Sequence, residues 1–366
     1  MINATFVMEQ HLGHQTYYQN LQQEVDLLSQ IQATWVPVIY PQLTPFWERM
    51  PQKLQHVRGT LVARAHVRKH IQRAASDIMF FNTQVPAVLC GRLKNRIPYV
   101  IATDITPLQY DRMGKHYGHQ PDTPGPLQRY KHALNVTTLR GAAHVLPWSR
   151  WTRDSLIRDY GVAPDRITVV SPGVDTARWR PAPRNDSHML RILFVGSDFH
   201  RKGGDVLLQA FRMLPKGTAE LHIVTSLDIA PEDGVRVYHL LRPNTQELIA
   251  LYQSADVFVL PAEAEAFGIA AIEAAATGLP SIVTAIGGLP DTVVDGETGF
   301  IIPPGDVHVL ASRLQHVLHE PQRRRSMGRA ARAYAEDHFD ARRSASSIVN
   351  CLQNAVEHRA EVTYAL

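Results

Sequence analysis

The sequence has very little cysteine. Only Cys90 and Cys351 occur among 366 residues, and neither belongs to a Cys-x-x-Cys or Cys/His motif. This scarcity excludes a miniprotein held together by disulfides and a zinc site built on cysteine. Two isolated cysteines are typical of a protein in a reducing compartment, so we expect a cytoplasmic location.

Long hydrophobic runs are missing as well. No window approaches 18 uninterrupted apolar residues, and residues 1–9 lack a basic stretch followed by an apolar one. We therefore expect neither a membrane-spanning helix nor an export signal. No serine or cysteine nucleophile motif stands out, and no Asp-x-Asp pair is present to hold a divalent metal on a diphosphate.

The small net charge of +4 hides an uneven distribution. The first 181 residues carry 21 basic and 12 acidic residues, whereas the rest of the chain carries 17 basic and 22 acidic residues. Residues 49–76 contain seven basic residues, three histidines and no acid. No nucleic-acid recognition motif accompanies this charge, so we do not expect a nucleic-acid partner.

The basic stretch has two interpretations. A helix over residues 61–75 would place Val67 and Ile71 on a narrow apolar arc surrounded by basic side chains. Such a helix would suit peripheral contact of residues 49–76 with the anionic inner face of a membrane that presents a lipid acceptor. The alternative is a solvated face over a small core contact.

Short apolar runs alternate with amphipathic stretches along the chain. This alternation predicts an α/β protein whose parallel sheets have helices on both faces. At about 150 residues per domain, the length suffices for two domains. The proline- and glycine-rich stretch 171–187 separates them. We expect one domain over residues 1–181, a second over 182–341, and a C-terminal helix at 342–359 that crosses back onto the first.

The elements expected in each half follow from the same pattern. We expect strands at 4–8, 34–40, 77–82, 99–103, 143–147 and 167–170, then at 191–195, 220–224, 257–260 and 281–284. We expect helices at 16–30, 61–75, 127–140 and 150–160, then at 205–213, 245–253, 267–277, 307–319 and 321–336.

The most informative segment is residues 261–280. A buried strand ends just before it, an acidic loop follows, and a helix then runs to a stop at Gly278. In an open parallel sheet such a loop faces the ligand crevice. The amides near Phe267, Gly268 and Ile269 would point at an anion there.

Two glutamates of this segment are candidate ligand-binding groups. Glu265 lies in the loop and Glu273 follows eight residues later on the helix. Carboxylates accept hydrogen bonds from vicinal hydroxyls, so the pair can hold two diols. The alternative is a first-turn charge at Glu265 and a solvated helix residue at Glu273. The apolar neighbours of Glu273 favour burial, which requires a partner.

These residues resemble a known family. The start Glu265-Ala266-Phe267-Gly268 and Glu273 eight residues on resemble the Glu-x7-Glu signature of the retaining nucleotide-sugar glycosyltransferases of family four, which have the two-domain, Rossmann-like GT-B fold. The runs 171–175, 195–205 and 287–300 resemble further elements of that family in order and spacing. The resemblance implies an α/β GT-B architecture with two doubly wound domains facing a central cleft.

The resemblance also implies roles for individual residues. Arg201 and Lys202 would bind the donor diphosphate and offset charge on the leaving group, although a solvated turn is the alternative. Glu265 would lie at the donor sugar and Glu273 at the nucleotide ribose. Further donor contacts are implied for Gly196, Phe267, Gly268 and Ile269, and less directly for the Leu241 backbone, near the base, and for Gly13.

The resemblance is incomplete on the acceptor side. Relatives often end one N-terminal strand with His-Asp, whereas Thr103-Asp104 stands here. Asp104 is therefore the candidate for acceptor binding or charge stabilisation, with an N-cap or turn residue as the alternative. The histidines, including His14 and His116, are expected to be surface or core residues.

The implied function is transfer of a hexose, with retention, from a nucleoside-diphosphate sugar to an acceptor hydroxyl on a lipid, polysaccharide or small molecule. We expect no metal and no cofactor, the nucleotide sugar being a co-substrate. A sugar-nucleotide epimerase of similar architecture and a catalytically silent nucleotide-sugar-binding module are the alternatives.

Overall fold

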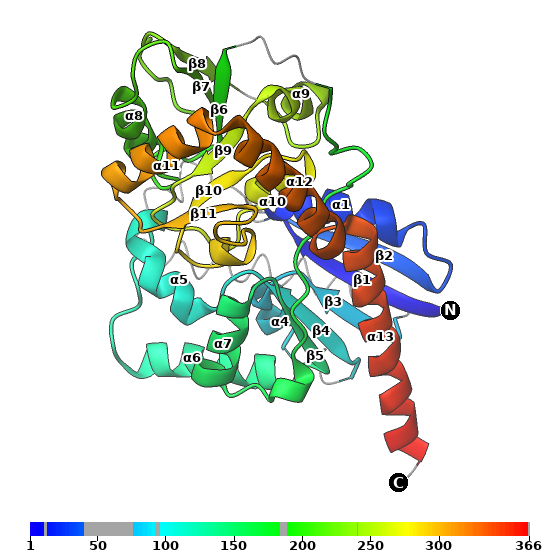
Figure 1. The fold of residues 1–366 in the computed structure, drawn as a ribbon. Coiled ribbons are helices and arrows are strands. Elements are labelled where there is room, and N and C mark those ends of the chain that lie inside the picture. Colours follow the sequence, from blue (N-terminus) through cyan, green and yellow to red (C-terminus); the bar gives the residue numbers. More distant parts are fainter. Residues whose placement is uncertain (11–12, 40–75, 92–95, 184–188, 240, 365–366) are drawn as a thin grey trace. The chain divides into compact units, whose positions relative to one another are not determined.

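The computed structural model describes residues 1–10, 13–39, 76–91, 96–183, 189–239 and 241–364. Contacts within the chain define two compact units. Unit 1 comprises Met1–Gln109, Pro121–Ser171 and Arg342–Leu366, and unit 2 comprises Tyr110–Gln120 and Pro172–Ala341. Each unit is built around one parallel sheet (Figure 1).

The sheet of unit 1 has the strand order β2-β1-β3-β4-β5, and all of its strand pairs are parallel. Its strands are β1 (Ile2–Glu9), β2 (Ile31–Val38), β3 (Ile78–Phe81), β4 (Tyr99–Thr103) and β5 (His144–Pro147). Its helices are α1 (His14–Val25), α4 (Gln84–Leu89), α6 (Pro126–Arg140), α7 (Arg150–Tyr160) and α13 (Ala341–Tyr364), which begins one residue before the boundary. Helix α5 (Pro107–Met113) leads from unit 1 into the 110–120 segment.

The sheet of unit 2 has the order β11-β10-β9-β6-β7-β8 and is also parallel throughout. Its strands are β6 (Leu190–Val195), β7 (Ala219–Val224), β8 (Val235–Tyr238), β9 (Val257–Leu260), β10 (Ser281–Thr284) and β11 (Gly299–Ile302). Its helices are α8 (Gly204–Arg212), α9 (Gln246–Ser254), α10 (Ile269–Ala276), α11 (Val307–His319) and α12 (Pro321–His338).

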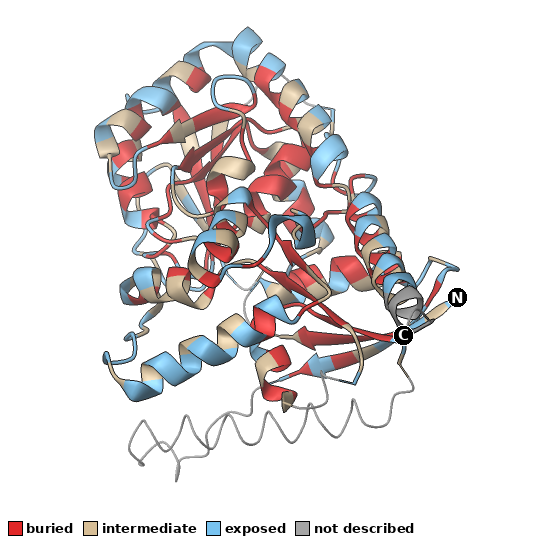
Figure 2. Ribbon diagram, turned by 90° about the horizontal axis from the view of Figure 1, so that it is seen from below, coloured by how far each residue is buried: buried red, intermediate tan, exposed pale blue. Residues whose placement is uncertain are grey.

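Burial follows the alternation that the sequence predicts. Strands β3, β4, β9 and β10 are buried at every position, whereas most helices keep an exposed face (Figure 2). Sheets covered on both faces need such continuous apolar strands. The predicted α/β class with two Rossmann-like parallel sheets is therefore confirmed.

Several short elements differ from the prediction. The strand expected at 167–170 is wrong as an element, because only an isolated bridge joins Ile167 to Val145. Helices α4 and α5 and strands β8 and β11 were not expected. Each is only four to seven residues long, too short for a periodic pattern to identify.

Two further expectations concern the ends of the units. Helix α13 packs on unit 1, where the Ser344 hydroxyl donates to the Ser171 carbonyl at 2.9 Å and Arg342 lies 3.8 Å from Glu24. The family resemblance also implies that residues 1–181 bind the acceptor and residues 182–341 the nucleotide-sugar donor, and these two roles stay predictions. The helix predicted at 61–75, and the basic stretch 49–76 apart from Ser76, lie outside the described residues. Within the described part of the chain, every helix is too short or too polar to cross a bilayer.

Candidate active site

The candidate site of unit 2 lies where the strand order reverses. The chain runs outward from β6 through β7 to β8 and then returns to place β9 on the other side of β6. Ligands of open α/β sheets bind beyond the carboxyl ends of the strands at such a switch point. The loops that follow β6 and β9, residues 196–203 and 261–268, meet there. The amide of Glu263, for example, donates to the Arg201 carbonyl at 3.0 Å.

Arg201 is held between these two loops. Its Nε donates to Asp198 Oδ2 at 3.0 Å, and its Nη1 donates to the Ala264 carbonyl at 2.7 Å. The side chain is only 6% exposed. A solvated turn, the alternative for this position, is therefore wrong for Arg201, whose guanidinium joins the two loops.

Lys202 and Glu265 form the centre of the cluster. Lys202 Nζ lies 3.0 Å from Glu265 Oε2, and Arg201 Nη1 lies 3.5 Å from the same oxygen. Burial of Glu265 would raise its pKa, but the charges of Lys202 and Arg201 outweigh burial and hold that pKa below its usual range. Within the described part of the chain the buried Oε2 makes no hydrogen bond of good geometry and is held by charge, so it can accept a hydrogen bond from a ligand hydroxyl.

The close approach of the loops depends on Gly203. Its φ is +79°, and a Cβ there would lie 1.9 Å from the Pro261 carbonyl oxygen. Both the conformation and the lack of space exclude a side chain at this position. Gly203 thereby brings the loop that carries Arg201 and Lys202 against the loop that carries Glu265.

Helix α10 begins beside this cluster. Gly268 is its N-cap, with a φ of +101°, and Ile269 is its first residue. The first amides of a helix have no partner within it, which makes its N-terminus favourable for an anion. The Phe267 side chain is buried and packs edge-on against Phe339, so any ligand contact of Phe267 is through its backbone.

Glu273 is buried, as its apolar neighbours predict, and the alternative of a solvated residue is wrong. It is 5% exposed, and the hydroxyl of Tyr252 on α9 donates to its Oε2 at 3.0 Å. Burial raises the pKa of Glu273 to about 7, although Tyr252 and Lys202 act in the opposite direction. A ligand that donates hydrogen bonds to this carboxyl group would favour its charged form.

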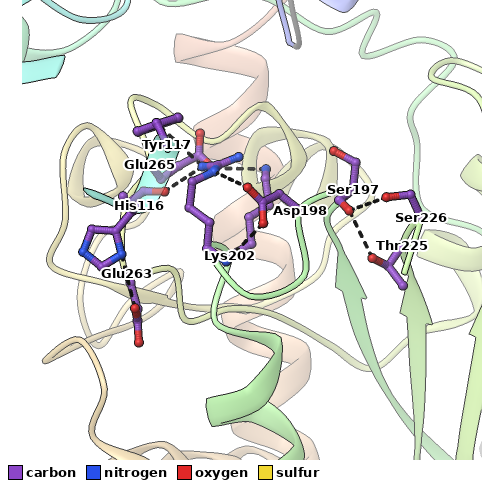
Figure 3. A network of polar contacts seen from close by, with 11 residues as sticks. His116, Tyr117, Ser197, Asp198, Lys202, Thr225, Ser226, Glu263 and Glu265 are labelled. Atoms are coloured by element: carbon purple, nitrogen blue, oxygen red, sulfur yellow. Dashed lines mark hydrogen bonds and ion pairs between the residues drawn. The ribbon is translucent and has the colours of Figure 1, made fainter. Parts of the chain in front are cut away.

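The segment 110–120 adds two side chains that the sequence did not suggest. The guanidinium carbon of Arg201 lies 4.6 Å from the centre of the Tyr117 ring. His116 Nδ1 lies 3.3 Å from Glu263 Oε2 (Figure 3). Tyr117 is 84 residues from Arg201 in the sequence, and His116 is farther still from Glu263, so no local motif could have indicated these contacts.

Unit 1 has a polar cluster of its own at the carboxyl ends of its strands. Asp104 follows β4, and its Oδ2 lies 3.5 Å from Nε2 of His14, the first residue of α1. The His14 ring packs on Trp148, and its buried Nδ1 has no hydrogen-bond partner among the residues that the structure describes. Burial lowers the pKa of His14, but Asp104 and Glu9 outweigh burial and raise it overall. The Asp104 carboxylate thus faces His14, whose partly buried side chain is 12% exposed.

The predicted site residues are therefore distributed as follows. The residues that contact one another in one cluster are Arg201, Lys202 and Glu265, and Gly196 lies against the Lys202 side chain, where a Cβ would meet Lys202 Cδ at 2.5 Å. Leu241 lies three residues beyond β8 and is half-buried. Gly13 and Asp104 belong to unit 1, where Gly13 is the N-cap of α1 in an ordinary helical conformation.

Comparison with protein families gives two adjacent matches. Residues 24–178 match the family described as Glycosyltransferase Family 4, and residues 175–334 match the family described as Glycosyl transferases group 1. The two matches together run through most of the chain and overlap at the boundary between its halves.

Individual relatives agree with these matches. The chain is 32% identical over 243 residues to a glycogen synthase of Mycobacterium tuberculosis, a stretch that covers 62% of this chain and 57% of the relative. It is 35% identical over 233 residues to a D-inositol 3-phosphate glycosyltransferase of Corynebacterium aurimucosum, which covers 56% and 55%. The match thus spans about half the length of the curated relatives.

Solved structures share the fold at low identity. A sucrose-phosphate synthase from Thermosynechococcus elongatus is 18% identical, with a TM-score of 0.76 over 97% of this chain and 99% of that one. Anabaena Alr3699/HepE, in complex with UDP and glucose, is 15% identical, with a TM-score of 0.67 over 96% of this chain and 100% of that one. These structures show that the chain has the GT-B fold, and the two family matches, which together run from residue 24 to residue 334, show that it is a glycosyltransferase of this group.

Proposed function

We propose that the protein transfers a hexose from a nucleoside-diphosphate sugar to an acceptor hydroxyl, with retention at the anomeric carbon. The observation that carries this proposal is the cluster of Arg201, Lys202 and Glu265 at the switch point of unit 2, beside buried Glu273. Two cations suit a diphosphate, and two carboxyl groups suit two sets of hydroxyls. The related fold of Alr3699/HepE holds UDP and glucose, which supports a ligand of this class.

Each residue would have a distinct part in donor binding. Lys202 and Arg201 would contact the diphosphate, and the first amides of α10 would lie near the same anion. Glu265 would accept hydrogen bonds from the sugar and Glu273 from the ribose. Glu265 is already charged beside Lys202. Glu273 would lose its proton on binding, because ribose hydroxyls that donate hydrogen bonds to its carboxylate favour the charged form.

The reaction we propose breaks one bond and forms one. The C1–O bond to the diphosphate breaks, the electron pair leaves with the nucleoside diphosphate, and the acceptor oxygen bonds to C1 from the same face. The acceptor proton goes to the leaving phosphate. Arg201 and Lys202 would stabilise the charge that grows on the leaving group, a role for which we expect no divalent metal. Asp104 and its partner His14 would contact the acceptor.

Donor turnover by the full chain tests this function. We would measure release of nucleoside diphosphate from a panel of nucleotide sugars, with and without hydroxylated acceptors, and determine the anomeric configuration of the product by NMR. Arg201→Ala and Glu273→Ala are expected to lower donor turnover by about 10- to 1,000-fold, because each removes a buried polar contact. Activity that survives a metal chelator would support metal independence.

The same assay separates the alternatives. An epimerase would convert or hydrolyse the donor equally well without an acceptor, and a silent module would bind nucleotide with no turnover. Near wild-type turnover in both Arg201→Ala and Glu273→Ala would contradict the assignment of the site.

A further inference from the structure

Residues 110–120 form an arm that belongs to unit 2, although the chain on both sides of it belongs to unit 1. The arm contains the end of α5, the 3-10 helix η2 (Gly114–Tyr117) and Gly118, whose φ of +64° ends that helix. Its side chains reach the cluster that we assign to the donor diphosphate. No motif of the sequence includes this arm.

Tyr117 contacts Arg201 in two ways. The guanidinium carbon lies 4.6 Å from the centre of the ring, and Arg201 Nη1 donates to the tyrosine hydroxyl at 3.4 Å. A cation over an aromatic face is attracted by the ring quadrupole, and more strongly where water is excluded. Because the Arg201 side chain is only 6% exposed, little water screens the attraction between its guanidinium and the Tyr117 ring.

Tyr117 acts together with the other contacts of Arg201. Nε is engaged by Asp198, and Nη1 by the Ala264 carbonyl, Glu265 and Tyr117. Among the described residues, only Tyr117 lies against the face of the guanidinium. The described residues show no hydrogen bond from Nη2. The guanidinium is planar, so fixing one face together with Nε and Nη1 also fixes where Nη2 points. A ligand oxygen would then meet a donor that is already oriented.

The arm is itself anchored to the same site. His116 lies 3.3 Å from Glu263, whose amide donates to the Arg201 carbonyl at 3.0 Å. Within the arm, the Tyr110 ring packs between Tyr117, at 5.2 Å, and His119, at 4.8 Å. Contact with the Tyr110 ring restricts the rotamers of Tyr117, so the ring can hold Arg201 in place.

We propose that Tyr117 is a positioning residue for the donor diphosphate, which orients Arg201 through its ring and hydroxyl and is held in place by the His116–Glu263 contact. The inference rests on the proposed function of the same site. Because Arg201 stabilises charge that grows on the leaving diphosphate, displacing it lowers kcat more than it raises KM.

A double-mutant cycle tests this role. Tyr117→Leu removes the ring and the hydroxyl, and is expected to lower kcat for donor turnover by about 10- to 30-fold. Tyr117→Phe keeps the ring and is expected to stay within about threefold of wild type, because a 3.4 Å hydrogen bond is weak. In an Arg201→Ala background, Tyr117→Leu should have less than about a twofold further effect, since it acts through the missing arginine.

A matched control is available in unit 2. The Arg313 guanidinium carbon lies 4.7 Å from the centre of the Phe300 ring on β11, an arginine–ring contact at nearly the same distance, and Arg323 lies 5.8 Å from the same ring. Phe300→Leu should lower the unfolding temperature but leave nucleotide affinity and kcat unchanged. A purely structural role of Tyr117 would make Tyr117→Leu behave in the same way.

The outcomes separate the two proposals. If wild type binds none of UDP, GDP and ADP in a direct titration, both the proposed function and the role of Tyr117 are contradicted. If wild type binds one of them, but Tyr117→Leu keeps wild-type kcat or its effect adds fully to that of Arg201→Ala, only the role of Tyr117 is overturned. The role of Tyr117 is supported if Tyr117→Leu lowers kcat, Tyr117→Phe keeps kcat near the wild-type value, and Tyr117→Leu has no further effect in the Arg201→Ala background.

Discussion

Glu273 carries an ionisable carboxyl group inside an apolar helix. It is 5% exposed, one hydroxyl donates to it, and burial raises its pKa to about 7. The folded protein therefore binds this proton more tightly than the unfolded chain, in which a glutamate has a pKa near 4.5. The protonated carboxyl contributes stability that is fully present below about pH 4.5 and is lost as the pH rises through about 7.

Glu273→Gln isolates this effect, because glutamine keeps an acceptor for Tyr252 but does not titrate. Between pH 5 and pH 8, the free energy of unfolding of wild type should fall relative to that of Glu273→Gln, by on the order of 3 kcal/mol at most. Chemical denaturation of both proteins at several pH values measures this difference. Parallel curves for the two proteins would show that Glu273 does not titrate in this range.

Single residues also show what the sequence could reveal about the site. Arg201, Lys202, Glu265 and Glu273 stand in short local strings beside glycines, and such strings are visible in one sequence. Tyr117 reaches Arg201 only because the 110–120 arm packs on unit 2, and His14 meets Asp104 only because α1 begins and β4 ends at the same edge of a sheet. Contacts of this kind depend on topology and leave no local pattern.

At the scale of elements, the site depends on loops that approach one another at the carboxyl ends of β6 and β9. Gly203 permits this approach, since a Cβ there would lie 1.9 Å from the Pro261 carbonyl oxygen. Backbone atoms cannot give way as the end of a flexible side chain can. A larger residue must therefore shift one loop and separate Lys202 from Glu265.

Two glycine substitutions distinguish the loss of stability caused by steric crowding from the loss caused by a left-handed backbone conformation. Gly203 and Gly217 have φ values of +79° and +76°, but a Cβ at Gly217 would have no atom within 4 Å. Gly217→Ala should cost only about 1 kcal/mol of unfolding free energy for the left-handed conformation. Gly203→Ala should cost about 3 kcal/mol or more and also weaken nucleotide binding.

Denaturant unfolding and nucleotide titration of both variants provide the check. Equal losses of stability in Gly203→Ala and Gly217→Ala would mean that the loops are less closely packed than the structure shows. Unchanged nucleotide affinity in Gly203→Ala would show that ligand binding does not depend on the close contact between Gly203 and Pro261.

The predictability of elements followed their length and burial. Fully buried strands such as β4 and β9 and long helices such as α6, α7 and α11 were recognised at or near their observed ends. Strand β8 was missed because it is four residues long and only half-buried, so its sequence lacks a continuous apolar run. The bridge at Ile167 shows the opposite error, in which an apolar run made too few hydrogen bonds to form a strand.

At the scale of the whole molecule, the two sheets could be predicted because alternating strands and helices allow few arrangements. The division of the chain could not be predicted in full. The proline-rich stretch 171–187 contains one boundary, but it falls after Ser171 and not after residue 181 as expected, and the 110–120 arm belongs to unit 2 while its neighbours in sequence belong to unit 1. Composition has no feature that indicates such an exchange.

The central claim is that unit 2 holds a nucleoside-diphosphate sugar. The most direct test is the thermal unfolding of the full chain with a panel of nucleoside diphosphates and their sugars, compared with Glu273→Ala. We expect one nucleotide series to raise the unfolding temperature of wild type by several degrees, since ligand at one hundred times Kd adds about 2.7 kcal/mol. Glu273→Ala should show a much smaller rise. No rise with any nucleotide, or the same rise in Glu273→Ala, would contradict the account.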